Sequence, residues 1–244
     1  MMPLFKNSKG FNIVCDWLAS KGTSPFLFQQ QSWQHIINGE SGVVNAPTGC
    51  GKTFSVFLGA IIDFINHHPD DYTSIKNSGL QLLWITPLRA LAKDIGRAME
   101  EVIDELGMNW KIGIRNGDTT TTERARQKKQ MPEVLIITPE SLHLLLAQKN
   151  YPDFFSSLKI IAVDEWHELL GSKRGVQVEL AVSRLINIQY SIFNARPTGS
   201  SGRAQVSIWG ISATLGNLEQ AMEVLLAPLS KWRGAGGEIG RAHV

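Results

Sequence analysis

Short apolar runs alternate with longer amphipathic segments along most of the chain. Runs such as VLIIT and KIIAVD are continuous and rich in β-branched residues and leucine, which suits strands buried on both faces of a parallel sheet. The pattern predicts strands at Gly42–Ala46, Leu80–Thr86, Lys111–Asn116, Val134–Thr138, Leu158–Asp164 and Gln205–Ser212. It predicts helices at Lys52–Asn66, Arg89–Leu106, Glu140–Ala147, Val176–Ile188 and Asn217–Leu226. This alternation indicates an α/β fold with a mostly parallel sheet flanked by helices, which binds its ligands at the carboxyl ends of the strands.

The composition restricts the class of protein but does not identify a binding partner. The chain has 244 residues, of which 43% are hydrophobic and 19% charged, so it can bury a core. Its 24 basic and 22 acidic residues give a net charge of +2, which excludes a strongly basic nucleic-acid binder. The two cysteines, Cys15 and Cys50, exclude a disulfide scaffold and a cysteine-built metal site. This low cysteine count favours a reduced, cytoplasmic location. No apolar run is long enough for a membrane span or a signal peptide, so we expect no membrane partner.

The last residues differ from the rest. Lys231–Val244 is rich in glycine and has no periodicity. Its final heptapeptide, Glu238–Val244, back-translates to a common sequencing-adapter sequence. We therefore expect one domain over residues 1–230 and interpret residues 231–244 as a non-native or disordered tail, with a flexible native terminus as the alternative.

The segment APTGCGKT follows the first predicted strand and precedes a helix, which is the context of a phosphate-binding P-loop. Ala46 stands where the pattern has its first glycine. The remaining glycines let backbone N–H groups point at phosphate, the lysine supplies charge, and the threonine hydroxyl suits Mg²⁺. We therefore predict nucleotide binding by Pro47, Thr48, Gly49, Cys50, Gly51, Lys52 and Thr53, with Thr53 also a metal ligand. The alternative is a glycine-rich turn without a ligand.

An acidic motif, DEWH, ends the apolar strand Leu158–Asp164. We predict that Asp164 holds Mg²⁺, that Glu165 orients or deprotonates the attacking water, and that Lys52 completes the catalytic set. His167 would couple the nucleotide site to another element by hydrogen bonding. The alternatives are acids that cap the next helix and a packed surface histidine.

Together these motifs resemble a superfamily 2 helicase of the DExH type, and in particular the ligase-associated DEXH-box DNA helicases, relatives of the Lhr (large helicase-related) proteins. The resemblance runs from about Cys15 to about Leu229. PFLFQQQSW resembles the family's entry motif, which implies that Gln29 reads adenine, with Gln30, Gln31 and Gln34 as nearby competitors.

Further motifs extend the family resemblance to the residues that contact nucleic acid. ITPLRAL, RNGDT and ITPESL resemble motifs that face the nucleic-acid backbone, and SAT resembles motif III, which links ATP hydrolysis to strand movement. The resemblance implies backbone contacts, without sequence specificity, from Thr86, Pro87, Arg89, Gly117, Asp118, Thr138 and Glu140. It implies coupling through Ser212 and Thr214, with His167 as their partner.

The resemblance implies a RecA-like P-loop NTPase domain, the first of two motor domains, in an ATP-dependent DNA helicase. Its cofactors would be ATP and Mg²⁺, and it would act in DNA repair with 3′-to-5′ polarity. DNA is the expected partner, and a DNA ligase and a nuclease are implied by the family alone. No second strand–helix series follows Ser212, so we expect an N-terminal fragment that binds nucleotide weakly and hydrolyses ATP poorly without the second domain.

Three other functions remain open at this point. One is an RNA helicase on the same fold, because backbone contacts do not identify the sugar. Another is a non-catalytic nucleic-acid-binding module, against which the intact P-loop and acidic motif argue. The third is a P-loop small-molecule kinase, which would lack the TPLRAL and SAT motifs.

A basic run follows TTTTE, in which Thr120 and Glu123 have the spacing of a capping box and so predict a short exposed helix. The run comprises Arg124, Arg126, Lys128 and Lys129. It is either a solvated basic face or a support for bound DNA.

Overall fold

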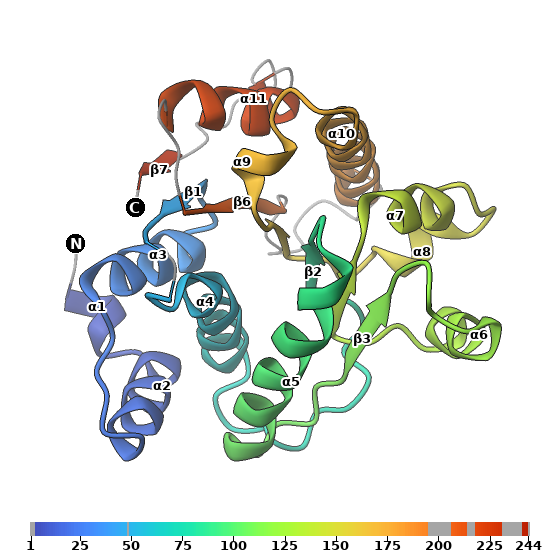
Figure 1. Cartoon of the computed structure of the whole chain (residues 1–244). Helices are drawn as coiled ribbons and strands as arrows, with labels where there is room; N and C mark the ends of the chain where they lie inside the picture. The colour runs from blue at the N-terminus through green and yellow to red at the C-terminus, as the bar shows by residue number, and fades with distance from the viewer. Residues whose placement is uncertain (1–2, 48, 195–205, 214–217, 231–240, 244) are drawn as a thin grey trace.

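The computed structural model describes residues 3–47, 49–194, 206–213, 218–230 and 241–243, and these form a three-layer α/β structure (Figure 1). The sheet has the strand order β3-β4-β2-β5-β6-β1-β7, and its described pairings are all parallel. The strands are β1 Ser41–Asn45, β2 Leu82–Ile85, β3 Ile112–Arg115, β4 Val134–Ile137, β5 Ile160–Val163, β6 Ser207–Ser212 and β7 Arg241–His243. The predicted α/β class with a parallel sheet is confirmed.

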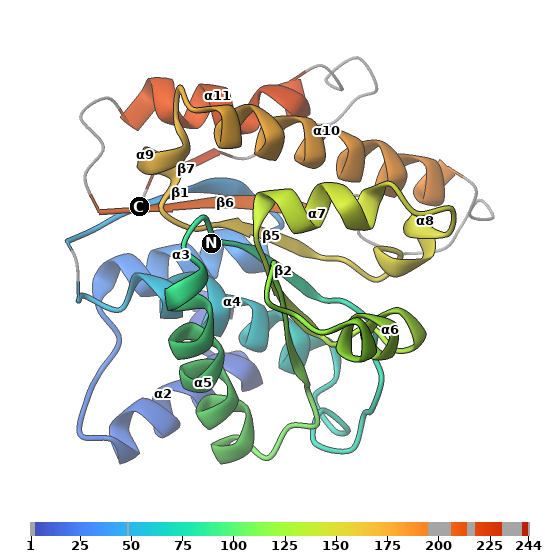
Figure 2. The same ribbon diagram turned by 45° about the vertical axis from the view of Figure 1, so that its right-hand side comes forward.

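One layer of helices covers each face of the sheet (Figure 2). The first layer holds α1 Pro3–Lys6, α2 Lys9–Ser20, α3 Leu27–Ile37, α4 Lys52–His67 and α5 Arg89–Glu105. The second holds α7 Pro139–Leu146, α8 Tyr151–Phe154, α9 Trp166–Leu169, α10 Lys173–Asn194 and α11 Leu218–Ser230, and α6 Thr121–Lys129 lies beside β3. Buried strand residues alternate between two apolar cores, so that Leu82 and Trp84 face the first layer and Leu83 and Ile85 the second.

Close backbone approach fixes the first layer around α4, the helix that leaves the P-loop. A side chain at Gly10 would meet the Ile62 carbonyl oxygen at 2.5 Å, and one at Gly59 would meet Ile36 Cδ1 at the same distance. Glycine at these positions lets α2 and α3 lie directly against α4. The P-loop helix therefore packs closely against two neighbouring helices.

The predicted elements agree with the structure to within a few residues, except for α10 and the tail. Helix α10 covers Lys173–Asn194, whereas Val176–Ile188 was expected, so the prediction was short at both ends. At its start the Ser172 hydroxyl accepts a hydrogen bond from the Gly175 N–H and caps the helix. In the tail, Arg241–His243 form an edge strand against β1. Main-chain pairing at a sheet edge needs no particular side chains, so periodicity did not reveal it. That residues 231–244 are non-native stays a prediction.

Candidate nucleotide and nucleic-acid site

The loop between β1 and α4 has the backbone conformation of a phosphate cradle. Gly49 and Gly51 have φ angles of 83° and 76°, a left-handed region that other residues enter at a cost. Gly51 is the N-cap of α4, which begins at Lys52, so the positive end of the helix dipole points into the loop. The Lys52 ammonium donates to the Pro47 carbonyl oxygen at 2.8 Å and spans the loop. Thr48 lies outside the described residues.

Gln29 is the glutamine that touches this loop. Its side chain is buried, accepts a hydrogen bond from the Phe26 N–H at 3.0 Å and donates one to the Gly51 carbonyl oxygen at 3.0 Å. Its competitors face elsewhere: Gln30 bonds the Pro25 carbonyl oxygen, Gln34 bonds Asn38, and Gln31 is exposed. The geometry therefore favours Gln29 over its neighbours, and adenine recognition by it stays a prediction.

The acidic motif lies where β5 ends. The Asp164 carboxylate accepts hydrogen bonds from the Glu165 N–H at 3.1 Å and from Trp84 Nε1 at 3.4 Å. Burial, together with the neighbouring Glu165 charge, raises the pKa of Asp164 to about 6, although these hydrogen bonds and the Lys52 charge act in the opposite direction. Glu165 itself has a φ of 47°, which is strained for a residue with a side chain and turns the backbone at the strand end.

His167 joins the acidic motif to β6. Its Nδ1 lies 2.9 Å from Ser212 Oγ and 3.4 Å from a carboxylate oxygen of Glu165. One ring nitrogen therefore faces both the acid expected to handle water and the serine of the SAT motif. The expected contact between His167 and Ser212 is present, and Thr214 lies outside the described residues.

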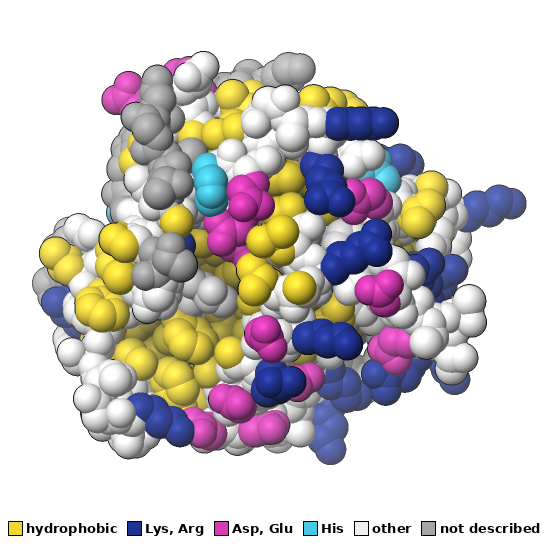
Figure 3. Space-filling model, viewed as in Figure 1, with side chains coloured by type: hydrophobic (Ala, Val, Ile, Leu, Met, Phe, Trp, Pro, Cys, Tyr) yellow, Lys and Arg dark blue, Asp and Glu magenta, His cyan; other side chains and the backbone are white. Residues whose placement is uncertain are grey.

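The residues expected to contact nucleic acid gather at the ends of the neighbouring strands β3, β4 and β2. The Arg89 guanidinium lies over Gly117, where an added side chain would meet its Nη1 at 2.8 Å, and Nη1 is 3.9 Å from the Asp118 carboxylate. Thr138 is the N-cap of α7, and its hydroxyl bonds Ser141. The buried Thr86 hydroxyl accepts a hydrogen bond from the Leu88 N–H at 3.4 Å. On the face that Figure 3 presents, Lys and Arg side chains gather on the right-hand side, with acidic side chains among them, near the centre and along the lower edge.

Arg174 is a further residue of this region, and motif matching did not select it. Its Nε donates to Glu140 at 2.8 Å, and its Nη1 donates to the Pro87 carbonyl oxygen at 3.4 Å. Burial raises the pKa of Glu140, but the hydrogen bond from its own N–H and the Arg174 charge outweigh burial, so the net shift is downward. Arg174 follows the DEWH motif by seven residues, and none of the motifs identified in the sequence includes it.

The structure divides the basic run. Thr120 caps α6 by accepting the Glu123 N–H at 3.2 Å, as its spacing predicted. Arg124 turns inward and donates to the Asn116 carbonyl oxygen at 2.8 Å, whereas Arg126 pairs with Glu123. Lys128 and Lys129 are exposed. Arg124 therefore supports the loop that contains Gly117. For the exposed members of the run, a role along bound DNA stays a prediction, with a solvated face as the alternative.

The donor set suits a hard cation. The Asp164 carboxylate and the Thr53 hydroxyl offer oxygen atoms, the kind of ligand that Mg²⁺ prefers, and a cation beside Asp164 would offset the burial that raises the pKa of this carboxylate. The described residues contain no cluster of three or more His, Cys, Asp or Glu side chains that could hold a metal by themselves. This fits a metal that is shared with nucleotide phosphates and water.

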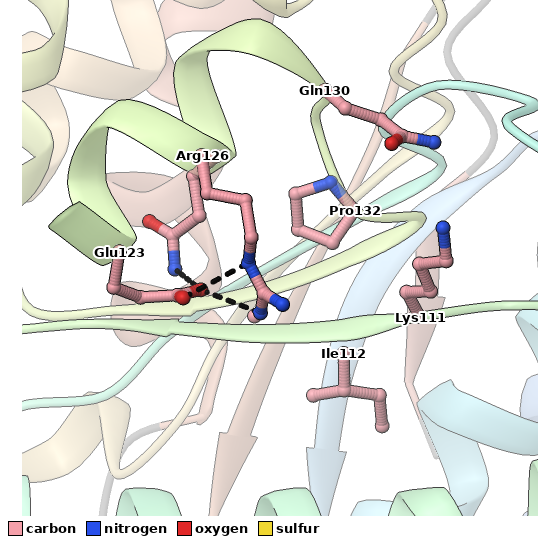
Figure 4. Close-up of a pocket in the computed structure, with 8 residues that line it drawn as sticks. Lys111, Ile112, Glu123, Arg126, Gln130 and Pro132 are labelled. Carbon is pink, nitrogen blue, oxygen red and sulfur yellow. Dashed lines mark hydrogen bonds and ion pairs between the residues drawn. The ribbon is translucent and has the colours of Figure 1, made fainter.

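A pocket of about 110 Å³ lies away from this region, between the outer edge of β3 and α6 (Figure 4). Arg126 and Gln127 both bond the Glu123 carboxylate within it, so its arginine is already paired. The pocket contains none of the residues of the P-loop or the acidic motif.

Among the described residues, no helix is both long and apolar enough to cross a membrane.

A family model for DEAD/DEAH box helicases matches residues 26–221. The chain is 32% identical over 181 residues to Lhr helicase/uracil glycosylase of Escherichia coli K12, an alignment that covers 70% of the chain and 12% of the relative. It is 36% identical over 166 residues to ATP-dependent helicase Lhr-Core of Methanothermobacter thermautotrophicus, covering 64% of the chain and 19% of the relative.

Two similar solved structures are also helicases. The helicase Lhr of Mycobacterium smegmatis, solved with ssDNA and AMP-PNP, superposes with a TM-score of 0.69 at 26% identity, over 97% of this chain and 27% of that one. The DUF1998 helicase MrfA, solved with DNA and AMPPNP, gives 0.71 at 25% identity, over 93% of this chain and 29% of that one. The chain thus spans less than a third of each of these similar proteins.

Proposed function

Since the chain belongs to the DEAD/DEAH box helicase family and has Lhr-type helicases among its relatives, we propose that it is the first of two RecA-like motor domains of a longer ATP-dependent DNA helicase. The observation that carries the proposal is the joint geometry of the P-loop and the acidic motif. The loop before α4 has two glycines in the left-handed region, and the charge of Lys52, the first residue of α4, lowers the pKa of the buried Asp164 at the end of β5.

The residues divide the work of phosphoryl transfer between them. In our proposal the P-loop N–H groups and Lys52 bind the β- and γ-phosphates, and Gln29 recognises the adenine. Thr53 and Asp164 would hold Mg²⁺, which supplies charge neutralisation on the phosphate oxygens. Glu165 would orient the attacking water and accept its proton, since this reaction depends mainly on positioning and electrostatic stabilisation.

Nucleic acid would lie across the ends of β2, β3 and β4. The hydroxyl, guanidinium and helix N-terminal groups there suit phosphate, which carries no sequence information, and a motor that steps along any sequence needs such contacts. DNA is favoured because Lhr and MrfA were both solved with DNA. RNA is the second candidate, and competition between a DNA and an RNA strand of the same sequence for the full-length protein decides between them.

The proposed repair role, polarity and partners rest on the family alone, whereas the proposed location rests on the composition of the chain. We propose a cytoplasmic protein that acts in DNA repair with 3′-to-5′ polarity and works with a DNA ligase and a nuclease. Copurification of those enzymes with the full-length protein tests the partners, and unwinding of substrates with opposite overhangs tests the polarity.

Nucleotide binding by the chain itself tests the core of the proposal. We expect a fluorescent ATP analogue to bind weakly in the presence of Mg²⁺, and Lys52→Ala to weaken binding by about 10- to 100-fold, the cost of one charge-assisted contact. Lys76→Ala is the matched control, because Lys76 is an exposed lysine that lies after α4 and outside the P-loop. Equal binding by both variants would contradict the assignment of the loop.

A further inference from the structure

Arg174 is placed to act on two of the segments expected to contact nucleic acid. From the start of α10, its guanidinium donates through Nε to the Glu140 carboxylate and through Nη1 to the Pro87 carbonyl oxygen. Pro87 leads into α5 and Glu140 lies in the first turn of α7. One planar side chain therefore spans two strand ends that do not otherwise share a side-chain bond among those described.

The position of Arg174 is fixed from the side of the acidic motif. Helix α9 begins directly after Glu165, and the Ser172 hydroxyl joins its end to α10 by donating to the Leu169 carbonyl oxygen at 2.7 Å and accepting the Gly175 N–H at 3.1 Å. A side chain at Gly175 would lie 2.1 Å from the Leu169 carbonyl oxygen. The two helices therefore approach at backbone distance, so the backbone at Arg174 is tied to the segment that follows Glu165.

A second contact ties α10 to α7. The His143 ring Nε2 lies 2.8 Å from the Gln177 carbonyl oxygen, one turn beyond Arg174. The start of α10 is thus held against both ends of α7, by a side-chain pair at Glu140 and a ring-to-backbone contact at His143. Since α7 follows Thr138, any displacement of α10 is passed to the expected phosphate-binding turn.

We propose that Arg174 is a positioning residue that links the acidic motif to the nucleic-acid-binding strand ends by holding Glu140 and Pro87 in one arrangement. The proposal rests on the proposed function. Exposed ion pairs contribute little to stability, and Arg174 and Glu140 are 48% and 39% exposed, so the value of this contact lies in geometry rather than in folding. Lysine cannot replace it, because one ammonium does not present two donors in a fixed fork.

The test compares Arg174→Gln, Arg174→Lys and the control Lys173→Gln in the full-length protein. The readouts are the single-stranded DNA concentration that half-saturates ATPase stimulation and the KM for ATP. We expect both Arg174 variants to raise the DNA concentration by about 5- to 50-fold, with the KM for ATP changed less than about twofold, as for the loss of a hydrogen bond to a charged group. Lys173→Gln should change neither value by more than about twofold.

Two further measurements separate positioning from direct contact. A cycle with Glu140→Gln should be non-additive, the double variant resembling Arg174→Gln, because the arginine acts through the glutamate. The salt slope of DNA binding should stay unchanged, whereas loss of a direct phosphate contact lowers it by about 0.7 for a single strand. Additive effects, a lowered slope, or Arg174→Gln behaving like Lys173→Gln would overturn the proposal. A wild-type protein whose ATPase ignores DNA would instead contradict the proposed function.

Discussion

Ser212 Oγ and His167 Nδ1 lie 2.9 Å apart, and this contact joins the end of β6 to the turn that follows β5. The same ring nitrogen is 3.4 Å from the Glu165 carboxylate. A movement of the Glu165 side chain during hydrolysis would therefore be transmitted through His167 to Ser212 at the end of β6. This relationship supports the coupling role proposed for the two residues.

Replacing His167 by alanine should separate hydrolysis from strand movement. We expect DNA-stimulated ATPase to stay within about tenfold of the wild type while unwinding falls by about 100-fold, because Glu165 and the P-loop remain in place. ATP hydrolysis and unwinding are measured on the same preparation. Parallel losses in both would show that His167 serves hydrolysis itself and would remove the coupling role.

Gly51→Ala should damage the nucleotide loop for two reasons. The residue has a φ of 76°, and an added side chain would meet Gln29 Nε2 at 2.9 Å. We expect loss of about 1–3 kcal/mol in unfolding free energy and a fall in nucleotide affinity of tenfold or more. Gly22→Ala is the control, since Gly22 has a φ of 70° but open space around it, and it should lose stability without losing nucleotide affinity. Normal nucleotide binding by Gly51→Ala would contradict the described loop.

Substitutions of the inward-facing and the exposed members of the basic run should differ in their effect on DNA affinity. Arg124→Gln removes the bond to the Asn116 carbonyl oxygen beside Gly117, so we expect weaker DNA binding by the full-length protein, by about 5- to 20-fold. Lys128→Gln removes an equal charge from the exposed face of the same helix and should change affinity less than about twofold. Binding curves at one fixed salt concentration compare them. Equal effects would return the run to a simple electrostatic role.

Gly175→Ala should disturb the junction between α9 and α10. The added carbon would lie 2.1 Å from the Leu169 carbonyl oxygen, so the helices must separate. We expect a loss of about 2 kcal/mol or more in unfolding free energy, measured by denaturant titration. An unchanged free energy would show that the junction adapts freely, which would also weaken the argument that Arg174 is fixed in place.

The second motor domain should decide activity. We expect the 244-residue chain to hydrolyse ATP at least about 10³-fold more slowly than the full-length protein with DNA, the size of effect that an arginine supplied by a partner domain has in related phosphoryl transfer. Initial rates at saturating ATP compare the two. A robust DNA-stimulated ATPase in the chain alone would contradict the two-domain account.

The sequence predicted the architecture because its signals are local. The continuous apolar runs at Val134–Ile137 and Ile160–Val163 identified buried parallel strands, and the P-loop pattern placed the start of α4 at Lys52. The site residues that belong to motifs could be predicted for the same reason. The spacing of Thr120 and Glu123 alone also predicted that Thr120 caps α6.

What the sequence could not predict depends on distant partners. Trp84 reads as a core residue, and its bond to Asp164 appears only when β2 and β5 pair. Arg174 reads as a surface charge until α10 lies beside α7, and β7 pairs through its backbone rather than through a side-chain pattern. These contacts join segments far apart in the chain, which periodicity does not link.

The most direct test of the account is the DNA-stimulated ATPase rate of the full-length protein carrying Glu165→Gln. We expect the rate to fall by about 10²- to 10⁴-fold, because the group that orients water and accepts its proton is lost, while ATP and Mg²⁺ still bind. Glu168→Gln, which removes a carboxylate one helical turn away, is the control and should keep the wild-type rate. A wild-type rate in Glu165→Gln would contradict the assignment of this site as the motor's catalytic centre.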